Sequence, residues 1–425
     1  MHPPSRAQPL WRIAAATAAC LLFPCWRAGA AESAPVSAPS SAPSTASPET
    51  VPAPAPASRP VAPASAAKLV LGAYAEILYA YNFNRPSNGI TALRGFDNRH
   101  NTFTVSNVAL DAAWEWESLS GRLTLQVGHT PSTYYLAEPA LPGGGGASSS
   151  GADVFKYIQQ AVVGWRAPIG RGLTFRAGLF VSPIGPEVIP VKDGWNWSRS
   201  NLFFGLPFYH TGLTASYDPT ATLSLTLMLC NGWNSVTDGN REKSVSVSAA
   251  LHPSPRWLIQ VLYFGGVERP AGAPEGRAWR HLFDAYAQWD ASDVLSFLLH
   301  ADGGFEPNLF GTSAWLAGAA YVRLHPLPWL YLAARGDAFW EKAAANGAGT
   351  AASLFWPVPW VASATATIDV RPHEHVSVRL EYRHDQAAGD AYFRGAVAGD
   401  GSALDPYVPN AHAQDTLLLG VTAWY

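Results

Sequence analysis

Charged side chains are scarce in this chain: Asp, Glu, Lys and Arg together make up only 14% of its 425 residues. Soluble domains usually carry about 25%. Aromatic residues are plentiful instead, at 12% with 17 Trp. A chain so poor in charge would solvate its own surface badly in water. The net charge of −3 also argues against nucleic acid as a partner, since such a partner needs a basic surface.

Long apolar runs are missing as well. Beyond the leader, no stretch of about 20 consecutive apolar residues is present, which a membrane helix would need. A transmembrane β-barrel needs no such run, because its lipid-facing residues occupy alternate positions. Low charge, many aromatic residues and no helical span together favour a membrane barrel.

Cysteine is rare, with three in the chain. Cys20 and Cys25 fall in the N-terminal leader, which leaves Cys230 without a partner for an internal disulfide. We interpret Cys230 as a packed thiol rather than a nucleophile. A lipoprotein leader ending at Cys20 or Cys25 is the less favoured alternative, because Pro24 precedes Cys25 and the apolar run before Cys20 is short.

The composition divides the chain into three segments. Residues 1–30 have the basic start, apolar middle and small-residue end of a secretory signal. Residues 31–67 are almost entirely Ala, Pro and Ser, which predicts a disordered linker, with a periplasmic arm touching the cell wall as the alternative. Residues 68–425 form the predicted barrel domain. We therefore expect a protein of the outer membrane, exported through its signal.

The barrel domain contains about sixteen strand-like segments in which apolar and polar residues alternate. These predicted strands are Leu69–Asn82, Phe103–Glu117, Leu119–His129, Phe155–Ala167, Leu173–Val181, Pro207–Tyr217, Leu223–Asn231, Ser244–His252, Trp257–Gly265, Arg280–Asp290, Val294–Gly304, Ala314–His325, Trp329–Phe339, Pro359–Arg371, Val376–Gln386 and Asp415–Tyr425.

The connections between these strands alternate between short and long. The long ones are Phe83–Thr102, Thr130–Val154, Ser182–Leu206, Gly232–Lys243, Gly266–Trp279, Phe305–Ser313, Trp340–Val358 and Ala387–Gln414. Tight periplasmic turns and long outer loops are typical of outer-membrane barrels. The fold class we predict is therefore all-β: a transmembrane, antiparallel, up-and-down β-barrel of about 16 strands, with long extracellular loops and short periplasmic turns.

Charges alternate with apolar residues along the predicted strands. In Val376–Gln386, Arg379, Glu381 and Arg383 share one face, and Val378 and Leu380 belong to the other. A basic residue that faces lipid at mid-depth costs about 2–4 kcal/mol. These charges must therefore face water, or one another, inside the barrel.

Aromatic residues cluster beside the short connections, as expected where rings lie at a membrane interface. They are Trp116, Trp165, Tyr217, Trp257, Trp289 and Trp329. The last strand ends in Tyr425 on an alternating apolar face, which resembles the signal that outer-membrane assembly machinery reads. This strand must pair with the first one, because an open sheet edge in lipid leaves backbone groups unpaired.

Several short blocks stand in order along the chain: Ala80–Ser87, Lys156–Ala161, Ser182–Glu187, Asn196–Ser200, Pro207–Gly212, Trp279–Asp284 and Leu380–Asp385. They resemble the OmpL-like family of outer-membrane beta-barrel porins, and the likeness covers roughly Gly72 to Tyr425. The resemblance implies a pore rather than a particular solute, and it makes a homotrimer worth testing. The chain departs from the family at Thr214, where a basic residue often stands.

A lumen bounded by about sixteen strands is too wide for strand side chains to fill, so a water channel is expected. We expect the loop Ser182–Leu206 to fold inward and narrow it, because prolines stiffen this loop and charges set the field at a constriction. The alternative is a surface loop packed on the rim. Candidate pore-lining and constriction residues are Glu187, Lys192, Asp193 and Arg199 in the loop, and Glu76, Asp111, Arg176, Arg335, Asp337, Arg379, Glu381 and Arg383 facing it.

The function we predict is passive diffusion of small polar solutes or ions across the outer membrane, with no enzymatic role, cofactor or metal. Mixed signs among the lining charges leave the ion preference open. A plugged structural or adhesion barrel that acts through its outer loops is the main alternative, and a barrel lipid hydrolase is a weaker one. In His373–His375 the two His are two residues apart on a short turn, whereas a zinc-protease helix spaces them by four.

Overall fold

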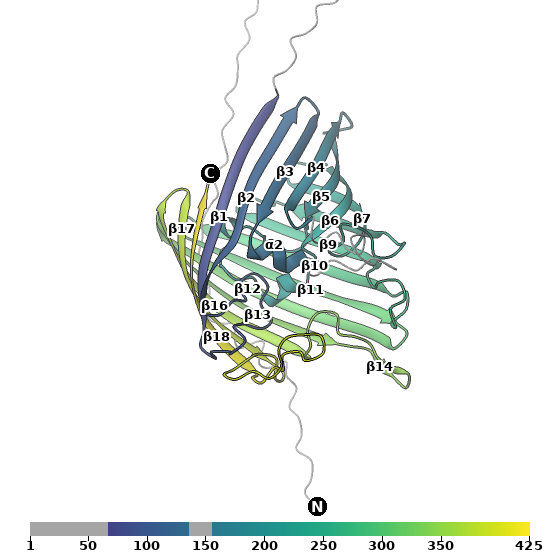
Figure 1. Cartoon of the computed structure of the whole chain (residues 1–425). Helices are drawn as coiled ribbons and strands as arrows, with labels where there is room; N and C mark the ends of the chain where they lie inside the picture. Colours follow the sequence, from purple (N-terminus) through teal and green to yellow (C-terminus); the bar gives the residue numbers. More distant parts are fainter. Residues whose placement is uncertain (1–66, 136–154) are drawn as a thin grey trace, which may run out of the picture.

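Sixteen antiparallel strands close into one barrel in the computed structural model, which describes residues 67–135 and 155–425 (Figure 1). The predicted signal 1–30, nearly all of the predicted linker 31–67 and most of the loop Thr130–Val154 lie outside the described residues. Around the barrel the strands follow their order in the chain, so the all-β, up-and-down architecture predicted from the sequence is confirmed.

The barrel strands correspond one to one with the sixteen predicted segments. They are β1 Lys68–Asn82, β2 Thr102–Trp116, β3 Leu119–Val127, β4 Ile158–Ala167, β5 Leu173–Val181, β6 Tyr209–Tyr217, β7 Leu223–Cys230, β8 Ser244–Leu251, β9 Trp257–Val267, β10 Trp279–Ser292, β11 Leu295–Asn308, β12 Gly311–Leu327, β13 Leu330–Lys342, β16 Trp360–His373, β17 Val376–Ala387 and β18 Ala413–Trp424.

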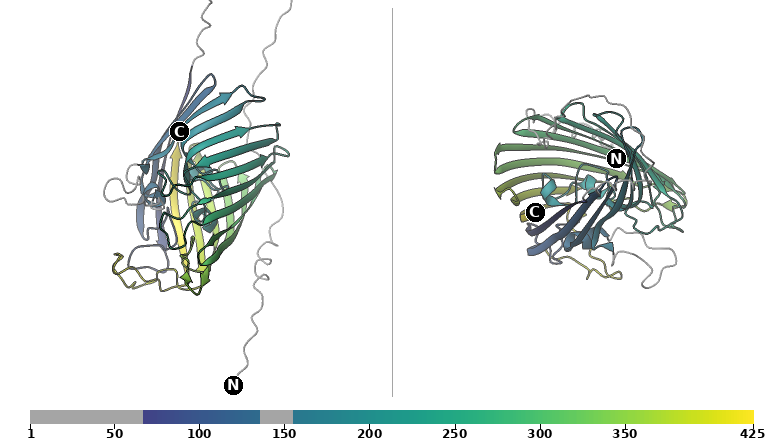
Figure 2. Two further views of the ribbon diagram at one scale, coloured as in Figure 1. Left: turned by 90° about the vertical axis from the view of Figure 1, so that its right-hand side faces the viewer. Right: turned by 90° about the horizontal axis from the view of Figure 1, so that it is seen from above.

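The other elements are short and lie in the loops. They are α2 His129–Tyr134, the 3-10 helix η3 Val191–Asp193, α4 Asn201–Phe204 and a small hairpin of β14 Ala345–Asn346 with β15 Gly349–Thr350. None of the helices within the described residues has the length and apolar character needed to cross a membrane. In the view from above, short helical pieces lie inside the ring of strands (Figure 2).

The first and last strands close the barrel. β1 pairs with β18 from Tyr74 opposite Trp424 to Asn82 opposite Thr416. Tyr425 continues the pairing: its N–H donates to the Ala73 carbonyl at 2.9 Å, and the Ala73 N–H donates to the Tyr425 carbonyl at 3.1 Å. Each barrel strand therefore has a neighbour on both sides, which satisfies the ladder groups that lipid could not.

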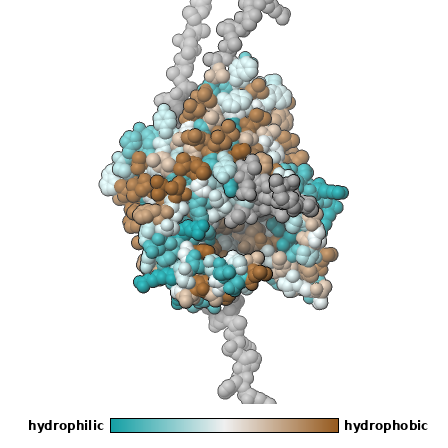
Figure 3. Space-filling model, in the orientation of Figure 1, coloured by the Kyte–Doolittle hydropathy of each residue, from teal (hydrophilic) through white to brown (hydrophobic). Residues whose placement is uncertain are grey.

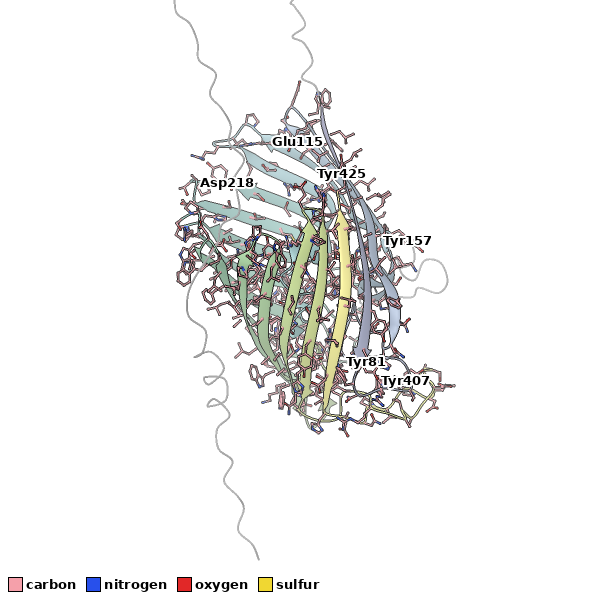
Figure 4. All side chains as sticks on the ribbon, turned by 90° about the vertical axis from the view of Figure 1, so that its left-hand side faces the viewer. Tyr81, Glu115, Tyr157, Asp218, Tyr407 and Tyr425 are labelled. Atoms are coloured by element: carbon pink, nitrogen blue, oxygen red, sulfur yellow. The ribbon has the colours of Figure 1, made fainter. Side chains whose placement is uncertain are left out.

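Short turns and long loops occupy opposite ends of the barrel. Glu115, Asp218 and Tyr425 mark the end with the short turns, whereas Tyr81 and Tyr407 lie toward the end with the long loops (Figure 4). The prediction of a long loop at Phe305–Ser313 is wrong. β11 and β12 continue through it, down to Asn308 opposite Gly311. Gly311 has a φ of +127°, a conformation that favours glycine, and this allows the chain to reverse sharply there.

The outer face of the barrel is apolar. Leu227, Leu299 and Leu316 project from it with exposed fractions of 55%, 61% and 63%, and apolar side chains colour broad areas of the surface over the strands (Figure 3). Near the short turns, Trp257 stacks on Trp289 with ring centroids 5.3 Å apart. Such an exposed apolar surface is stable only against hydrocarbon.

The two faces of β7 allow a direct test of this orientation. We expect Leu227→Arg to lower the free energy of unfolding by about 2–4 kcal/mol, because a guanidinium would face lipid. Thr226→Arg, one residue away on the lumen face, should change it by less than about 1 kcal/mol. Equilibrium unfolding of the two variants in lipid vesicles measures both values. Equal losses in the two variants would contradict the assignment of faces.

Candidate functional site

The loop of residues 182–206, here called the inner loop, crosses the interior of the barrel. Near its start, the Gly185 N–H donates to Asp284 on β10 at 3.3 Å. Farther along, the Val191 N–H donates to Glu76 on β1 at 2.6 Å. β1 and β10 are seven strands apart around a ring of sixteen, so they are nearly opposite each other. The loop therefore spans almost the full width of the lumen and does not pack on the rim.

Carboxylates of the barrel wall accept hydrogen bonds from the backbone of the inner loop. Glu381 on β17 accepts from the N–H groups of Trp197 at 2.6 Å and Ser198 at 2.9 Å. Asp337 on β13 accepts from the Asn201 N–H at 3.0 Å and from its side-chain amide at 2.8 Å. An irregular loop inside a barrel needs such acceptors, because its buried N–H groups have no ladder partner.

Arginines of the wall satisfy the carbonyl groups of the same loop. Arg335 on β13 donates to the Ser198 carbonyl at 2.6 Å and to the Arg199 carbonyl at 3.2 Å. Arg379 on β17 donates to the carbonyls of Val191 at 3.0 Å and Asn196 at 3.1 Å. A guanidinium suits this role because it carries several donors in a rigid plane.

Arg383 on β17 acts in the same way, through the Arg199 carbonyl. Arg335, Arg379 and Arg383 are all buried, and each pairs with an aspartate of the wall. These pairs are Arg335–Asp337 at 3.1 Å, Arg379–Asp369 at 3.3 Å and Arg383–Asp385 at 2.6 Å. Pairing neutralises each arginine locally, which is what allows a charge to remain buried.

The inner loop also organises itself. Glu187 accepts from the Ser200 N–H at 3.0 Å and pairs with Arg335 at 3.2 Å. The Ser200 hydroxyl caps α4 by accepting from the Phe203 N–H at 3.1 Å. Arg199 turns back onto its own loop and donates to the Val188 carbonyl at 3.0 Å. These contacts give the loop one defined shape rather than a set of alternatives.

A second loop, residues 83–101, also lies inside the barrel and contacts the wall and the inner loop. Arg94 pairs with Asp385 of β17 at 3.2 Å, and Gln414 of β18 donates to the Ala92 carbonyl at 2.9 Å. Phe96 packs edge-on against Phe203 of the inner loop, with centroids 5.7 Å apart. The two loops therefore support each other inside the barrel.

Apolar side chains fill much of the space beside the inner loop. Ile184, Leu202 and Leu206 of the loop belong to a buried cluster with residues of β9, β10 and β13, among them Phe264 and Phe339. Cys230 is buried in the same cluster, as expected for a packed thiol. This part of the lumen is a packed interior rather than an aqueous channel.

The lumen face of β5 and β6 is different in its short-turn half, because it is open to solvent there. Arg176 on β5 pairs in register with Thr214 on β6, which pairs with Met228 on β7. Met228 belongs to the apolar cluster inside the barrel, so all three point inward. Arg176 is nevertheless exposed, and Thr214 is partly exposed. Space for water therefore lies inside the barrel on this side.

A basic cavity of about 200 Å³ lies between the inner loop and the short-turn end of the barrel. It is lined by Val294, Leu295, Ser296, Arg323, His325, Tyr331 and Arg371. The Arg323 guanidinium lies 4.8 Å from the ring centre of Trp195 in the inner loop. Within residues 67–135 and 155–425, Arg323 has no carboxylate in ion-pair contact, whereas Arg371 pairs with Asp369 at 3.1 Å. The cavity therefore carries an excess of positive charge.

The predicted site residues fall into two groups. Eight of them form the contacts that hold the inner loop: Glu76, Glu187, Arg199, Arg335, Asp337, Arg379, Glu381 and Arg383. The other four take no part in these contacts, although Lys192 and Asp193 belong to the loop itself. Lys192 and Asp193 pair with each other at 2.9 Å, Asp111 pairs with Arg122 at 2.8 Å, and Arg176 faces the open side. A role for these residues in setting the pore field stays a prediction.

Sequence reasoning missed several residues of this site. Asp369 and Asp385 were visible as charges on the lumen face of their strands, two positions from other charges. Arg323 was also visible, as a charge within the predicted strand Ala314–His325. Arg94 gave no such signal, because it stands in a predicted loop and only the closed barrel brings it to Asp385, 291 positions away in the chain. Asp284, His300 and Asp302 are missing from the predicted site because they stand among apolar residues in the sequence.

Residues 68–420 match the family model described as "Putative beta-barrel porin-2, OmpL-like". No curated protein is close enough in sequence to count as a relative of this chain.

Several solved structures share the fold at low sequence identity. The outer-membrane channel DcaP of Acinetobacter baumannii has a TM-score of 0.53 at 10% identity, over 84% of this chain and 97% of its own. The trimer form of OmpT, an outer-membrane protein of Vibrio cholerae, has a TM-score of 0.55 at 9% identity, over 85% and 100%. An anion-selective porin from Comamonas acidovorans has a TM-score of 0.52 at 10% identity, over 85% and 100%.

The buried arginines of the wall should be needed for stability. We expect Arg335→Met to lower the free energy of unfolding by about 3–5 kcal/mol, because it leaves Asp337 and Glu187 without their ion pair and two loop carbonyls without a donor. Arg176→Met, an equivalent change at an exposed lumen position, should cost less than about 1 kcal/mol. Denaturant unfolding in lipid vesicles gives both values. A small loss for Arg335→Met would mean that this arginine does not hold the loop.

Proposed function

This chain belongs to the putative beta-barrel porin-2, OmpL-like family, and we propose that it is a narrow channel for the passive diffusion of small polar solutes and ions. The observation that carries the proposal is the solvent-open side of the lumen beside the inner loop, where Arg176 is exposed although it points inward. Water inside a barrel provides a route for polar solutes that hydrocarbon does not.

In this proposal the inner loop sets the width of the route. Its backbone is held by charged side chains from β1, β13 and β17, so thermal motion should not open it freely. The charges predicted to line the constriction act chiefly as its supports. Diffusion needs no catalytic group, and we propose a channel rather than an enzyme.

One observation favours a second candidate function, a plugged barrel that acts through its outer loops. The inner loop contributes Ile184, Leu202 and Leu206 to a packed apolar cluster. If packing continued across the whole lumen, no solute would pass. Liposome swelling with sugars of increasing size separates the two candidates, since a channel admits the smaller sugars and a plugged barrel admits none.

The assembly and export of the protein are also proposals. One structure with the same fold is a trimer form, and we propose a homotrimer for this chain. We further propose that residues 1–30 are the export signal, that residues 31–67 are a spacer, and that the β18 end is read by the outer-membrane assembly machinery. Light scattering of the detergent-solubilised protein measures the number of copies.

Shortening the inner loop should widen the channel. We expect replacement of residues 187–200 by a short Gly-Ser linker to raise single-channel conductance severalfold, because it removes the segment that crosses the lumen. Removal of the exposed β14–β15 hairpin, residues 345–350, serves as the control and should leave conductance unchanged. Equal conductance of both variants and the wild type in planar bilayers would count against a constriction at this loop.

The basic cavity should bias the channel toward anions. We expect the double variant Arg323→Gln, Arg371→Gln to shift the reversal potential in a salt gradient toward cations, because it removes two positive charges from the lumen mouth. Arg277→Gln, at an exposed arginine of an outer loop paired with Glu242, is the control. An unchanged reversal potential in the double variant would remove the cavity from the ion pathway.

A further inference from the structure

Two aspartates face each other on the wall of the lumen, with a histidine beside them. Asp284 on β10 and Asp302 on β11 are direct cross-strand partners, and His300 lies two residues before Asp302 on the same strand. All three are buried, with exposed fractions of 2%, 2% and 4%. One potential ligand atom from each lies within 4.8 Å of the other two.

The strand register gives this group no basic neighbour. Asp284 pairs with Leu262 on β9, and Asp302 pairs with Ala317 on β12. Like charges directly opposite each other destabilise a sheet, and burial strengthens their repulsion. Three aspartates of the wall beside the inner loop, Asp337, Asp369 and Asp385, each have an arginine in ion-pair contact. Among the residues that the structure describes, Asp284 and Asp302 have no such arginine.

The hydrogen bonds of the group leave two polar atoms over. His300 Nε2 bonds to Asp284 Oδ2 at 2.6 Å, and the Trp315 indole N–H donates to Asp302 Oδ1 at 2.9 Å. Asp302 Oδ2 and His300 Nδ1 are buried without a partner among the residues that the structure describes. Buried polar atoms are normally paired, so two unpartnered atoms within one group of two carboxylates and a histidine point to a ligand.

Protons alone would not complete this arrangement. Protonation would turn Asp302 Oδ2 into a hydroxyl donor, yet this atom has no hydrogen-bond partner within residues 67–135 and 155–425. A protonated His300 would add an N–H at Nδ1 where a buried partner is already lacking. A divalent cation, in contrast, would neutralise both carboxylates and use the spare lone pairs of Asp302 and His300.

We propose that Asp284, His300 and Asp302 form a binding site for a zinc-like divalent transition-metal ion in the wall of the lumen. Zinc accepts both carboxylate oxygen and imidazole nitrogen, and three protein ligands leave a fourth position for water. Magnesium does not suit the site, because it prefers an octahedral shell of oxygen atoms. An ion held by all three residues would require the His300 ring to turn, because Nε2 now bonds to Asp284 whereas Nδ1 has the spare lone pair.

The site would join the wall to the start of the inner loop. The Gly185 N–H donates to Asp284 at 3.3 Å, and Gly185 has a φ of +77°, which suits glycine. A Cβ at this position would lie 3.3 Å from His300 Cε1 and 2.8 Å from the Leu206 side chain. The bound ion would therefore fix the end of the loop opposite Glu76, and this holds whether or not the barrel conducts solutes.

Titration of tag-free, folded, EDTA-treated protein with ZnCl₂ in detergent tests the proposal. We expect one ion per chain, no comparable binding of MgCl₂, and a zinc absorption edge with oxygen and one imidazole as ligands. The variant Asp302→Asn, His300→Ala should bind zinc more than about 100-fold more weakly, because it removes two of the three ligands and loss of an outer-shell partner alone costs about 10–100-fold. Asp290→Asn, which removes a different carboxylate from β10, should bind like the wild type.

Two results would overturn the site. One is wild-type protein that takes up no zinc, and the other is zinc that the double variant binds as tightly as the wild type. Heat-modifiable migration on gels and circular dichroism verify that each variant is a folded barrel. If the double variant does not fold, the wild-type titration and its ligand spectrum decide alone, since zinc without an imidazole ligand would also exclude the site.

Discussion

Every peptide group of this protein that leaves water must find a partner within the chain, and the rest of the structure follows from that requirement. Lipid offers no hydrogen bonds, so the strands can cross the membrane only as a closed sheet. Pairing of β1 with β18, extended by Tyr425 and Ala73, meets the requirement at the seam. Closing sixteen strands then creates a lumen that side chains on the strands cannot fill.

The same requirement explains how a loop can lie inside that lumen. The inner loop has no sheet to pair with, so Glu76, Glu381 and Asp337 accept from its N–H groups, and wall arginines donate to its carbonyls. Charged side chains are used because a charge-assisted hydrogen bond is stronger than a neutral one. The charged residues that the sequence analysis predicts to line the pore therefore act mainly by supporting the inner loop.

The lumen is consequently uneven. Around β9 to β13 it is packed with apolar side chains from the wall and the inner loop, whereas the short-turn half of β5 and β6 keeps Arg176 and Thr214 in contact with solvent. A narrow route on one side of a supported loop combines the stability of a packed interior with access for small solutes. The buried Asp284, Asp302 and His300 belong to the packed side, where an unpaired charge is least tolerated.

Much of this fold was readable from the sequence, because alternation and turn length are local properties. Period-two patterns gave all sixteen strands, and Leu173–Val181 was placed to the residue. The loop Phe305–Ser313 failed because its residues continue both strands up to a turn that Gly311 permits. The inward fold of residues 182–206 was expected from its prolines and charges, but its partners were not specified.

The sequence by itself determined which side chains face lipid and which face the lumen, since a strand alternates and lipid rejects charge. Only the tertiary structure decided which charges meet. Arg94 and Asp385, or Glu76 and Val191, are brought together by barrel closure and by the path of a loop, and neither leaves a local trace in the chain. The pairing of Asp284 with Asp302 likewise depends on register, because a shift of one residue would turn one of them toward lipid.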